Sequence, residues 1–386
     1  MLGENVPLRG QDRWRSRDLE SGPAIVFYEM TQACDLVCLH CRASAQCQPH
    51  PHELRHTESL QLVDQLMEFE DPPMLVLTGG DPFKRADLLD IVEYAVGLGI
   101  EVSVTPSATP LATRDAIRQL ADAGVSRLAV SIDGADATTH DRHRGVPGSF
   151  ARSLQMLDDA HDAGLATQVN TTLMPSNLHQ IDQLAELLAT RHIVLWSVFF
   201  LVPVGRALTG PRLSPEECEE AFDLLWQQAQ RRRYMIKTTE APHYRRYVLQ
   251  NRRAASPHKP VASPLGLNDG KGILFVSHTG QIFPSGFLPI VCGQFPVDTL
   301  KAVYQQSPLF LRLRDADRLE GKCGLCEFKR ICGGSRARAY ALTGNPFAEE
   351  PDCIYQPRPA RVTPAGVDAA GSVFPPAAAR ADTRIG

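Results

Sequence analysis

The sequence predicts an α/β fold with a parallel sheet, open or barrel-like, between residue 24 and about residue 202. Two observations predict it. Short apolar runs rich in Val, Ile, Leu and Thr alternate with amphipathic stretches, and this alternation occurs six times. Near-continuous apolar runs are typical of parallel strands that helices cover on both faces. In such folds, functional sites gather at the C-terminal ends of the strands.

The six expected strands are Ala24–Glu29, Met74–Thr78, Glu101–Thr105, Arg127–Ser131, Thr167–Thr172 and Leu195–Leu201. Helical patterns lie between them. The helix expected over Thr57–Phe69 begins with a threonine that can cap it, and its apolar residues recur at helical spacing. Those expected over Thr113–Ala123 and Ser149–Ala163 each end before a glycine, as helix C-termini often do.

After residue 203 the strand–helix rhythm stops. A helix is expected over Pro215–Arg232, then a basic, proline-containing stretch over Arg245–Pro264. A hairpin is expected over Gly272–Pro289, where a Thr-Gly turn separates two apolar runs. The end of the chain is rich in Pro, Ala, Gly and Arg, and is expected to be disordered. We divide the chain into an N-terminal extension (1–23), a core (24–235), a C-terminal α+β domain (236–356) and a tail (357–386).

Composition excludes several classes of function. Hydrophobic residues make up 43% and charged residues 22% of the 386 residues, which is typical of a globular protein with an ample core. A net charge of −4 gives no basic field for nucleic acid. No apolar run reaches the roughly 18 residues of a membrane span, and residues 1–17 lack the apolar region of a secretory signal. We therefore expect a cytoplasmic protein without nucleic-acid or membrane partners.

Seven of the ten cysteines fall into two groups. Without a secretory signal, clustered cysteines indicate metal ligands before disulfides. The first group, Cys34-x3-Cys38-x2-Cys41, directly follows the first expected strand. Three thiolates on a tight loop suit three irons of a [4Fe–4S] cluster, and an iron left without a protein ligand can bind a small molecule. A zinc site, or core cysteines with accidental spacing, is the alternative.

This motif, placed after the first strand of a six-fold α/β repeat, resembles that of the radical S-adenosylmethionine (SAM) superfamily over about residues 24–355. The resemblance implies a partial (β/α)6 barrel of the TIM type and SAM bound to the open iron. It further implies reductive cleavage of SAM to a 5′-deoxyadenosyl radical that abstracts a substrate hydrogen, with an electron donor such as flavodoxin or ferredoxin. The reaction class implied is oxidoreductase or lyase.

The resemblance also assigns SAM-binding positions. Thr78-Gly79-Gly80-Asp81-Pro82 resembles the family's GGEP motif, with Asp in place of Glu. The remaining assigned positions are Ser131 and Asp133 in VSIDG, Arg144 in HRG, Asn170 on the fifth strand, and Leu201-Val202 after the sixth. The alternatives are a strand-end turn for the glycines, helix caps for Ser131 and Asp133, and a solvated surface arginine.

The second group is Cys323-x2-Cys326-x5-Cys332 with Cys353. It resembles the SPASM or twitch extension, which holds auxiliary [4Fe–4S] clusters. Full SPASM domains hold two clusters and have cysteines where this chain has Arg336 and Ser285. We therefore expect one auxiliary cluster, held by those four cysteines, with Cys292 as the one spare ligand. Structural zinc is the alternative.

Two substrate classes fit. The segments CGLCEFKRICGGSRARAYALTGNPFAEEPDC and KTTEAPHYRR resemble those of tetrapyrrole-modifying radical SAM enzymes of alternative haem synthesis, some of which are decarboxylases. The same architecture serves maturases of ribosomally made peptides, and a zinc-stabilised scaffold without catalysis is a third reading.

A local excess of positive charge favours an acidic substrate such as a porphyrin, because arginine pairs with carboxylates. Its members are Arg231–Arg233, Arg245, Arg246, Arg252, Arg253 and Lys259. The alternative to a carboxylate-binding surface is a solvated basic helix. Glu240, His243 and Tyr244 in the same region are candidates for a general acid or base.

Overall fold

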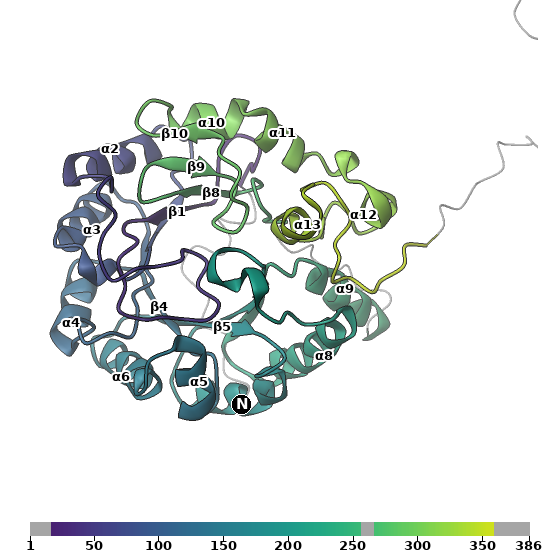
Figure 1. Ribbon diagram of the computed structural model, residues 1–386, viewed down its shortest axis with the longest axis horizontal. Helices are drawn as coiled ribbons and strands as arrows, with labels where there is room; N and C mark the ends of the chain where they lie inside the picture. Colours follow the sequence, from purple (N-terminus) through teal and green to yellow (C-terminus); the bar gives the residue numbers. More distant parts are fainter. Residues whose placement is uncertain (1–16, 256–265, 359–386) are drawn as a thin grey trace, which may run out of the picture.

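The computed structural model describes residues 17–255 and 266–358 and contains one sheet of ten strands. Helices surround this sheet on its outer side (Figure 1). The strand order is β10-β9-β8-β1-β2-β3-β4-β5-β6-β7, and β8 and β1 to β7 are all parallel. The strands are β1 (Ile25–Glu29), β2 (Met74–Thr78), β3 (Val102–Val104), β4 (Arg127–Ser131), β5 (Thr167–Leu173), β6 (Leu195–Phe200), β7 (Met235–Thr239), β8 (Ile273–Val276), β9 (Gln281–Phe283) and β10 (Gly293–Gln294).

Every helix expected from the sequence is present. The helices are α2 (His56–Leu66), α3 (Leu88–Gly97), α4 (Arg114–Asp122), α5 (Ala137–Arg144), α6 (Ser149–Asp162), α7 (Ile181–Ala189), α8 (Pro215–Arg231), α9 (His243–Ala255), α10 (Leu300–Gln306), α11 (Pro308–Arg314), α12 (Gly321–Leu325) and α13 (Arg336–Thr343). Short 3-10 turns occur at Pro82–Lys84, Leu178–Gln180, Gly205–Thr209 and Ala316–Arg318. The predicted α/β fold class is confirmed. Among the described helices, none has the length and apolar character needed to cross a membrane.

The two faces of the sheet differ in polarity, as β5 illustrates. Val169 and Thr171 are buried, whereas Gln168, Asn170 and Thr172 are partly exposed. Alternate residues of a strand point to opposite faces, so the apolar set packs under the helices and the polar set faces the interior of the curved sheet. The concave face is therefore the polar face.

The sheet extends beyond the six expected strands. β7 pairs with β6 from Leu195↔Met235 to Phe199↔Thr239. The hairpin expected over Gly272–Pro289 is confirmed as β8 and β9, and β8 pairs with β1 from Ile25↔Ile273. The expected boundary between residues 235 and 236 falls inside β7, so the strands assigned to the C-terminal domain continue the sheet of the core. The division into domains stays a prediction.

Some expected segments lie partly or wholly outside the described residues. The basic stretch expected over 245–264 is helical to Ala255 and leaves the described part there. Most of the N-terminal extension and of the tail expected to be disordered, residues 1–16 and 359–386, also lie outside it.

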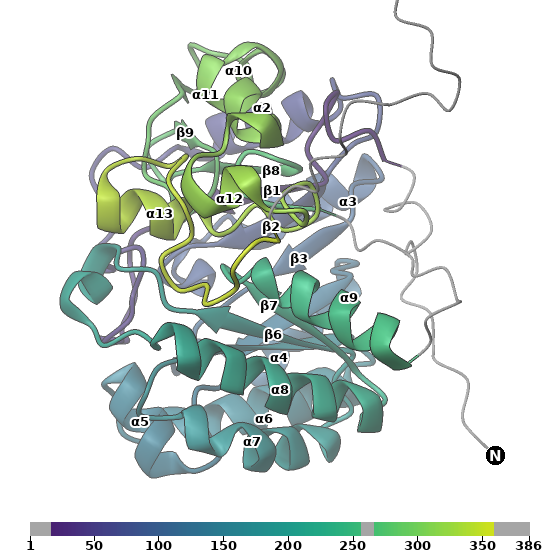
Figure 2. The same cartoon turned by 90° about the vertical axis from the view of Figure 1, so that its right-hand side faces the viewer.

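One buried arginine joins the C-terminal segment to the sheet. Arg338 on α13 pairs with Glu350 (Nη1–Oε1 3.0 Å) and with Asp352 (Nε–Oδ2 3.0 Å), and it also donates to the carbonyl oxygen of Phe200 (3.2 Å). Figure 2 shows β6 and β7 between α8 on one side and α13 on the other. Burial alone would raise the pKa of Glu350, but the Arg338 guanidinium lowers it to about 2. Removing one partner of such a buried pair is costly because the other charge stays buried.

Replacing Arg338 by Met should cost about 3–5 kcal/mol in the free energy of unfolding at pH 7, because two buried carboxylates lose their cation. Folding lowers the pKa of Glu350 from 4.5. The pair's contribution is therefore present above that value and lost as the pH falls toward about 2. In anaerobic urea unfolding, the difference in the free energy of unfolding between wild type and variant should stay constant from pH 7 to about pH 5 and decrease as the pH falls from there toward 2.

Arg318→Met is the matched control, since Arg318 is exposed and pairs with the exposed Asp315. It should change the free energy of unfolding by no more than about 0.5 kcal/mol. An Arg338→Met cost no larger than that of Arg318→Met would contradict the structural role given to the buried pair.

Candidate functional site

The first cysteine group lies at the carboxyl ends of the strands. Cys34, Cys38 and Cys41 are on the loop after β1, and all three line a cavity of about 1060 Å³. The same cavity is lined by the ends of β2, β4, β5 and β6. Parallel strands thus bring together residues that are far apart in the sequence, as expected for this class of fold.

The three sulfur atoms lie in surroundings suited to thiolates. Backbone N–H groups of Leu36 and Ala45 donate to Cys34 Sγ (3.3 Å) and Cys41 Sγ (3.4 Å). Arg144 Nη1 lies 3.8 Å from Cys38 Sγ. Burial raises the pKa of both the Cys34 and Cys38 thiols. These N–H groups and the positive charge of a bound metal would offset that burial cost, because metal ligands must be deprotonated. The donor set fits an iron–sulfur cluster.

Glycines hold the cysteine loop from three sides. A Cβ on Gly80 would lie 2.3 Å from the carbonyl oxygen of Ala33, and one on Gly205 would lie 2.2 Å from that of Arg42. Gly145, with φ of 73°, ends α5, and a Cβ there would lie 2.6 Å from Val37. Only glycine allows backbone to approach so closely. The loop is therefore fixed by main-chain packing before any ligand binds.

Arg206 clamps the loop and offers a free donor. Its Nε donates to the carbonyl oxygen of Cys38 (3.0 Å) and its Nη1 to that of Ala45 (2.8 Å). Arg206 lines the cavity, and its Nη2 is buried without a hydrogen-bond partner. A buried guanidinium donor without a partner favours an anionic group, and the carboxylate of SAM fits it.

The structure buries Asp133, which was expected to bind ribose. Its carboxylate is fully buried, 2.7 Å from Arg144 Nε and 3.3 Å from His40 Nε2. Burial would raise the pKa of Asp133, but the charges of Arg144 and His40 lower it to about 2. The Asp133 side chain therefore orients Arg144 and His40, both of which line the cavity. Its contact with ribose stays a prediction.

Part of the GGEP-like segment lines the cavity, and the rest of it stabilises the turn that follows. Gly79 and Gly80 line the cavity. Asp81 is fully buried, accepts from Thr109 Oγ1 (2.6 Å) and caps the 3-10 turn that begins at Pro82. Ser131, Arg144, Asn170, Leu201 and Val202 line the cavity as expected. Their roles as SAM contacts stay predictions.

Sequence reasoning missed several cavity residues. His40 lies between two of the cysteines, and the others end strands or follow them. The missed residues include His40, Ser107, Thr172, Phe199, Arg206 and Phe287. The strand alternation that exposes Asn170 also exposes Thr172, two positions on, and could have found it. Arg206 and Phe287 follow β6 and β9 in loops, where the sequence carries no such signal.

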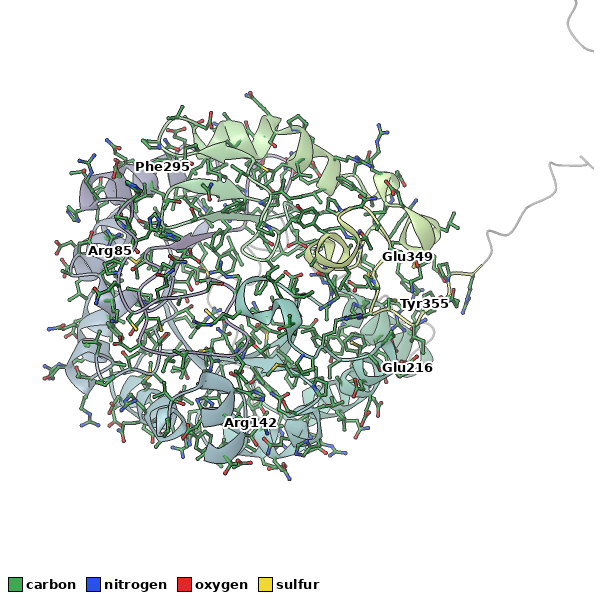
Figure 3. All side chains as sticks on the ribbon, viewed as in Figure 1. Arg85, Arg142, Glu216, Phe295, Glu349 and Tyr355 are labelled. Atoms are coloured by element: carbon green, nitrogen blue, oxygen red, sulfur yellow. The ribbon has the colours of Figure 1, made fainter. Side chains whose placement is uncertain are left out.

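The second cysteine group lines a separate cavity of about 380 Å³. Cys323, Cys326, Cys332 and Cys353 all line it, together with Tyr355. Tyr355 is at the edge of the molecule, beside α9 and α12 and on the opposite side from Arg85 (Figure 3). The four cysteines surround this space rather than converge on one point. In the part of the chain that the structure describes, no three His, Cys, Asp or Glu side chains are placed to hold one metal ion.

Backbone donors also point at these sulfur atoms. The N–H groups of Glu350, Phe328 and Gly334 donate to Cys323 Sγ (3.3 Å), Cys326 Sγ (3.4 Å) and Cys332 Sγ (3.4 Å). Burial raises the pKa of Cys332 to about 12 and that of Cys353 to about 11. The surroundings are of the same kind as in the first cavity and fit four iron-bound thiolates.

The two positions at which SPASM domains have further cysteines play structural roles here. Arg336 is buried and donates to the carbonyl oxygens of Pro346 (3.0 Å) and Ala348 (2.7 Å). Ser285 is hydrogen-bonded to Asp269. Cys292 lines neither cavity, and its sulfur lies 3.5 Å from the carbonyl oxygen of Ile290.

The candidate acids and bases are not in the first cavity. His243 lines the second cavity and is buried with both ring nitrogens unpartnered. Glu240 is hydrogen-bonded to Ser335, and Tyr244 packs on Phe222 with ring centroids 5.4 Å apart. Their catalytic roles stay predictions that the geometry of the first cavity does not favour.

The basic stretch does not form one patch. Arg232 pairs with Glu186, and Arg246 pairs with Glu219. Arg245 is turned inward and donates to the carbonyl oxygen of Ile331 (3.0 Å). Arg231, Arg233, Arg252 and Arg253 are exposed, and Lys259 lies outside the described residues. The carboxylate-binding surface that this stretch suggested is therefore split by local ion pairs.

Known proteins match both the sequence and the fold. A family model described as the radical SAM superfamily matches residues 28–188. The AdoMet-dependent heme synthase of Oleidesulfovibrio alaskensis is 38% identical over 355 residues, which are 89% of this chain and 90% of that protein. The enzyme of the same name from Methanosarcina barkeri is 36% identical over 345 residues, covering 88% and 98%. Streptococcus suis SuiB bound to S-adenosylmethionine has the same fold, with a TM-score of 0.70 at 16% identity and coverage of 87% and 78%.

Replacing Gly80 by Ala should displace the cysteine loop, because the new Cβ would meet the carbonyl oxygen of Ala33. We expect the anaerobically reconstituted variant to lose about four irons per chain, the content of one [4Fe–4S] cluster. Gly97→Ala is the control, since a Cβ there meets nothing within 4 Å. Full iron content in Gly80→Ala would show that the loop does not need this close approach.

Proposed function

The chain belongs to the radical SAM superfamily, and on that premise we propose that it decarboxylates propionate side chains of an iron tetrapyrrole in the formation of haem. One observation carries the proposal. Two enzymes named for haem synthesis match it at 36% and 38% identity along nearly the whole of both chains. The two cysteine-lined cavities provide the sites that such chemistry needs.

The residues of the first cavity fit both cofactors of the family. Cys34, Cys38 and Cys41 would hold three irons of a [4Fe–4S] cluster, and SAM would bind the fourth. Together the two supply a 5′-deoxyadenosyl radical that removes a hydrogen atom from the substrate. Arg206 and Arg144 would bind the SAM carboxylate, and Ser131 would bind the ribose. An electron donor such as flavodoxin or ferredoxin belongs to the proposal.

The rest of the cavity suits a large planar substrate. Phe199 and Phe287 line it together, with ring centroids 6.1 Å apart, and Val202 and Val204 add apolar surface. Aromatic rings pack well on flat π systems, so a macrocycle would find an apolar wall beside the SAM site.

The proposed reaction has a defined balance. Each propionate loses one hydrogen atom to the radical, carbon dioxide and one electron, and becomes a vinyl group. A one-electron acceptor is therefore required. Cys323, Cys326, Cys332 and Cys353 would hold a second [4Fe–4S] cluster, which makes about eight irons per chain.

The two alternatives have weaker support. SuiB has been solved with a precursor peptide, SuiA, but at 15% identity this likeness concerns the fold alone. A zinc-stabilised scaffold would need four ligands around one ion, whereas among the described residues no three His, Cys, Asp or Glu side chains are placed to hold one metal ion. Colour and metal content distinguish a zinc scaffold from the haem enzyme and the peptide maturase, because zinc protein is colourless.

Replacing Cys34 by Ala should abolish SAM cleavage, since the first cluster loses a ligand. We expect 5′-deoxyadenosine formation with dithionite to fall at least a hundredfold, as measured by chromatography. Cys47→Ala is the control, because Cys47 is exposed and lines neither cavity. Cys323→Ala should retain SAM cleavage while losing about four irons and the decarboxylated product. Retained cleavage in Cys34→Ala would refute the assignment of the first site.

Substrate class is tested with SAM and reconstituted wild-type enzyme that has been reduced with dithionite and then separated from the excess reductant. Iron-coproporphyrin III should lose two molecules of carbon dioxide and, counted on the neutral acid, four hydrogens, about 92 mass units in all, when a one-electron oxidant is supplied as the acceptor. Candidate precursor peptides should keep their mass. Modification of a peptide, with the porphyrin unchanged, would favour the maturase reading instead.

A further inference from the structure

Three cations lie near enough to one another for their charges to interact. They are Arg127 on β4, Lys237 on β7 and Arg245 on α9. Arg127 Nη1 donates to Gln168 Oε1 (3.4 Å), and its Nε is buried without a partner. Arg245 donates to backbone carbonyl oxygens. Across residues 17–255 and 266–358, no carboxylate lies within ion-pair distance of the three. The charge of Glu101 partly offsets the burial of Arg127, and that of Glu240 the burial of Arg245, whereas no carboxylate acts on Lys237.

Strand register places Lys237 on the face that lines the SAM cavity. Lys237 pairs with Ser197, which pairs with Asn170, so the three side chains share a face. Asn170 lines the cavity. Two residues further on, Thr239 pairs with Phe199, another cavity residue, and Thr239 Oγ1 lies 3.1 Å from Ser197 Oγ. Lys237 therefore points into the interior, about 7 Å along the strand from the register position of Phe199.

Arg127 reaches the same region from the other side. Gln168 accepts from Arg127 and donates to Asn170 Oδ1 (2.7 Å). A row of polar side chains thus runs from the cavity residue Asn170 to Arg127. Lys237 is exposed and does not itself line the cavity, but it lies two residues along β7 from Thr239, the partner of the cavity residue Phe199, so a small anionic group that extends from the cavity can reach it.

Like charges at such a place are unfavourable for folding. Burial, and the positive charges of Arg127 and Arg245, lower the pKa of Lys237 to about 8. The ammonium group is still mostly protonated at pH 7. No carboxylate of the described chain neutralises it, so the uncompensated charge calls for an anion from outside the protein.

We propose that Lys237, with Arg127 and Arg245, binds a propionate carboxylate of the tetrapyrrole substrate. The macrocycle would pack on Phe199 and Phe287 while one propionate reaches the three cations. This inference rests on the proposed function and goes further, because it names the side chains that recognise the acidic substituent. The SAM carboxylate is a second source of the same chemistry, and the experiment separates the two.

The test measures binding to the reconstituted enzyme with SAM present but without reductant, so that no turnover occurs. Iron-coproporphyrin III and its tetramethyl ester, which has no carboxylate, are titrated by the change in the Soret band. Wild type should bind the acid at least tenfold more tightly than the ester. Lys237→Met should lose at least tenfold in affinity for the acid and less than twofold for the ester. Arg127→Met should show the same loss of affinity for the acid and the same small change for the ester.

Arg142→Met is the matched control, since Arg142 is exposed at the rim of the molecule (Figure 3). Its affinities should equal those of wild type. SAM affinity, measured by calorimetry, should be unchanged in Lys237→Met, and a tenfold loss would overturn the inference in favour of the SAM carboxylate. Lys237→Met should also unfold at a higher urea concentration than wild type, because a charge repulsion is removed. A lower midpoint would show a structural role and overturn the inference.

The outcomes distinguish a failure of the cation site from a failure of the proposed function. If wild type binds acid and ester equally, or if Lys237→Met keeps its affinity for the acid, the cation site is wrong while the proposed function stands. If wild type binds neither porphyrin, the proposed function fails and the carboxylate site fails with it.

Discussion

The close main-chain packing around the cysteine loop is the constraint on which the site depends. Gly80, Gly145 and Gly205 each leave no room for a Cβ, and they come from β2, α5 and the turn after β6. The turn after β2, the end of α5 and the turn after β6 must therefore all be in position before the loop after β1 can take its path. The parallel sheet is thus the frame that sets the positions of the three thiols. Arg206 adds a side-chain clamp to the same loop.

A second constraint joins the C-terminal segment to this frame. Arg338 donates to Phe200 and Leu201 at the end of β6 while pairing with Glu350 and Asp352. The N–H group of Glu350 also donates to Cys323, a cysteine of the second cavity. The two cysteine groups are therefore connected through one buried ionic network, which ties the wall of the second cavity to the strand that ends at the first. Buried charges that are fully paired in this way fix geometry at some cost in desolvation.

Sequence patterns predicted the first six strands and missed β7. The six were found because they are rich in Val, Ile, Leu and Thr and recur between helical patterns, and this includes β5 (TQVNTTL), most of whose residues are polar. β7, with the sequence MIKTT, was missed because Lys237 and Thr239 face the interior. In the site, spacing alone identified the cysteines. It could not show that Asp133 is buried under Arg144, that Arg245 turns inward, or that Phe287 reaches the cavity from a loop after β9, since these depend on contacts between distant segments.

The polar residues of β7 belong to a concave face that carries polar side chains on several strands. A sheet interior filled for stability alone would carry branched apolar residues, as barrel interiors usually do. Here Arg127, Gln168, Asn170, Ser197 and Lys237 occupy positions that apolar side chains could fill. Hydrogen bonds satisfy the neutral members, whereas among the described residues Glu101 is the one carboxylate that acts on Arg127 and none acts on Lys237. The interior is thus polar where a ligand would have to be recognised, and the stability lost there is offset by the apolar outer face under the helices.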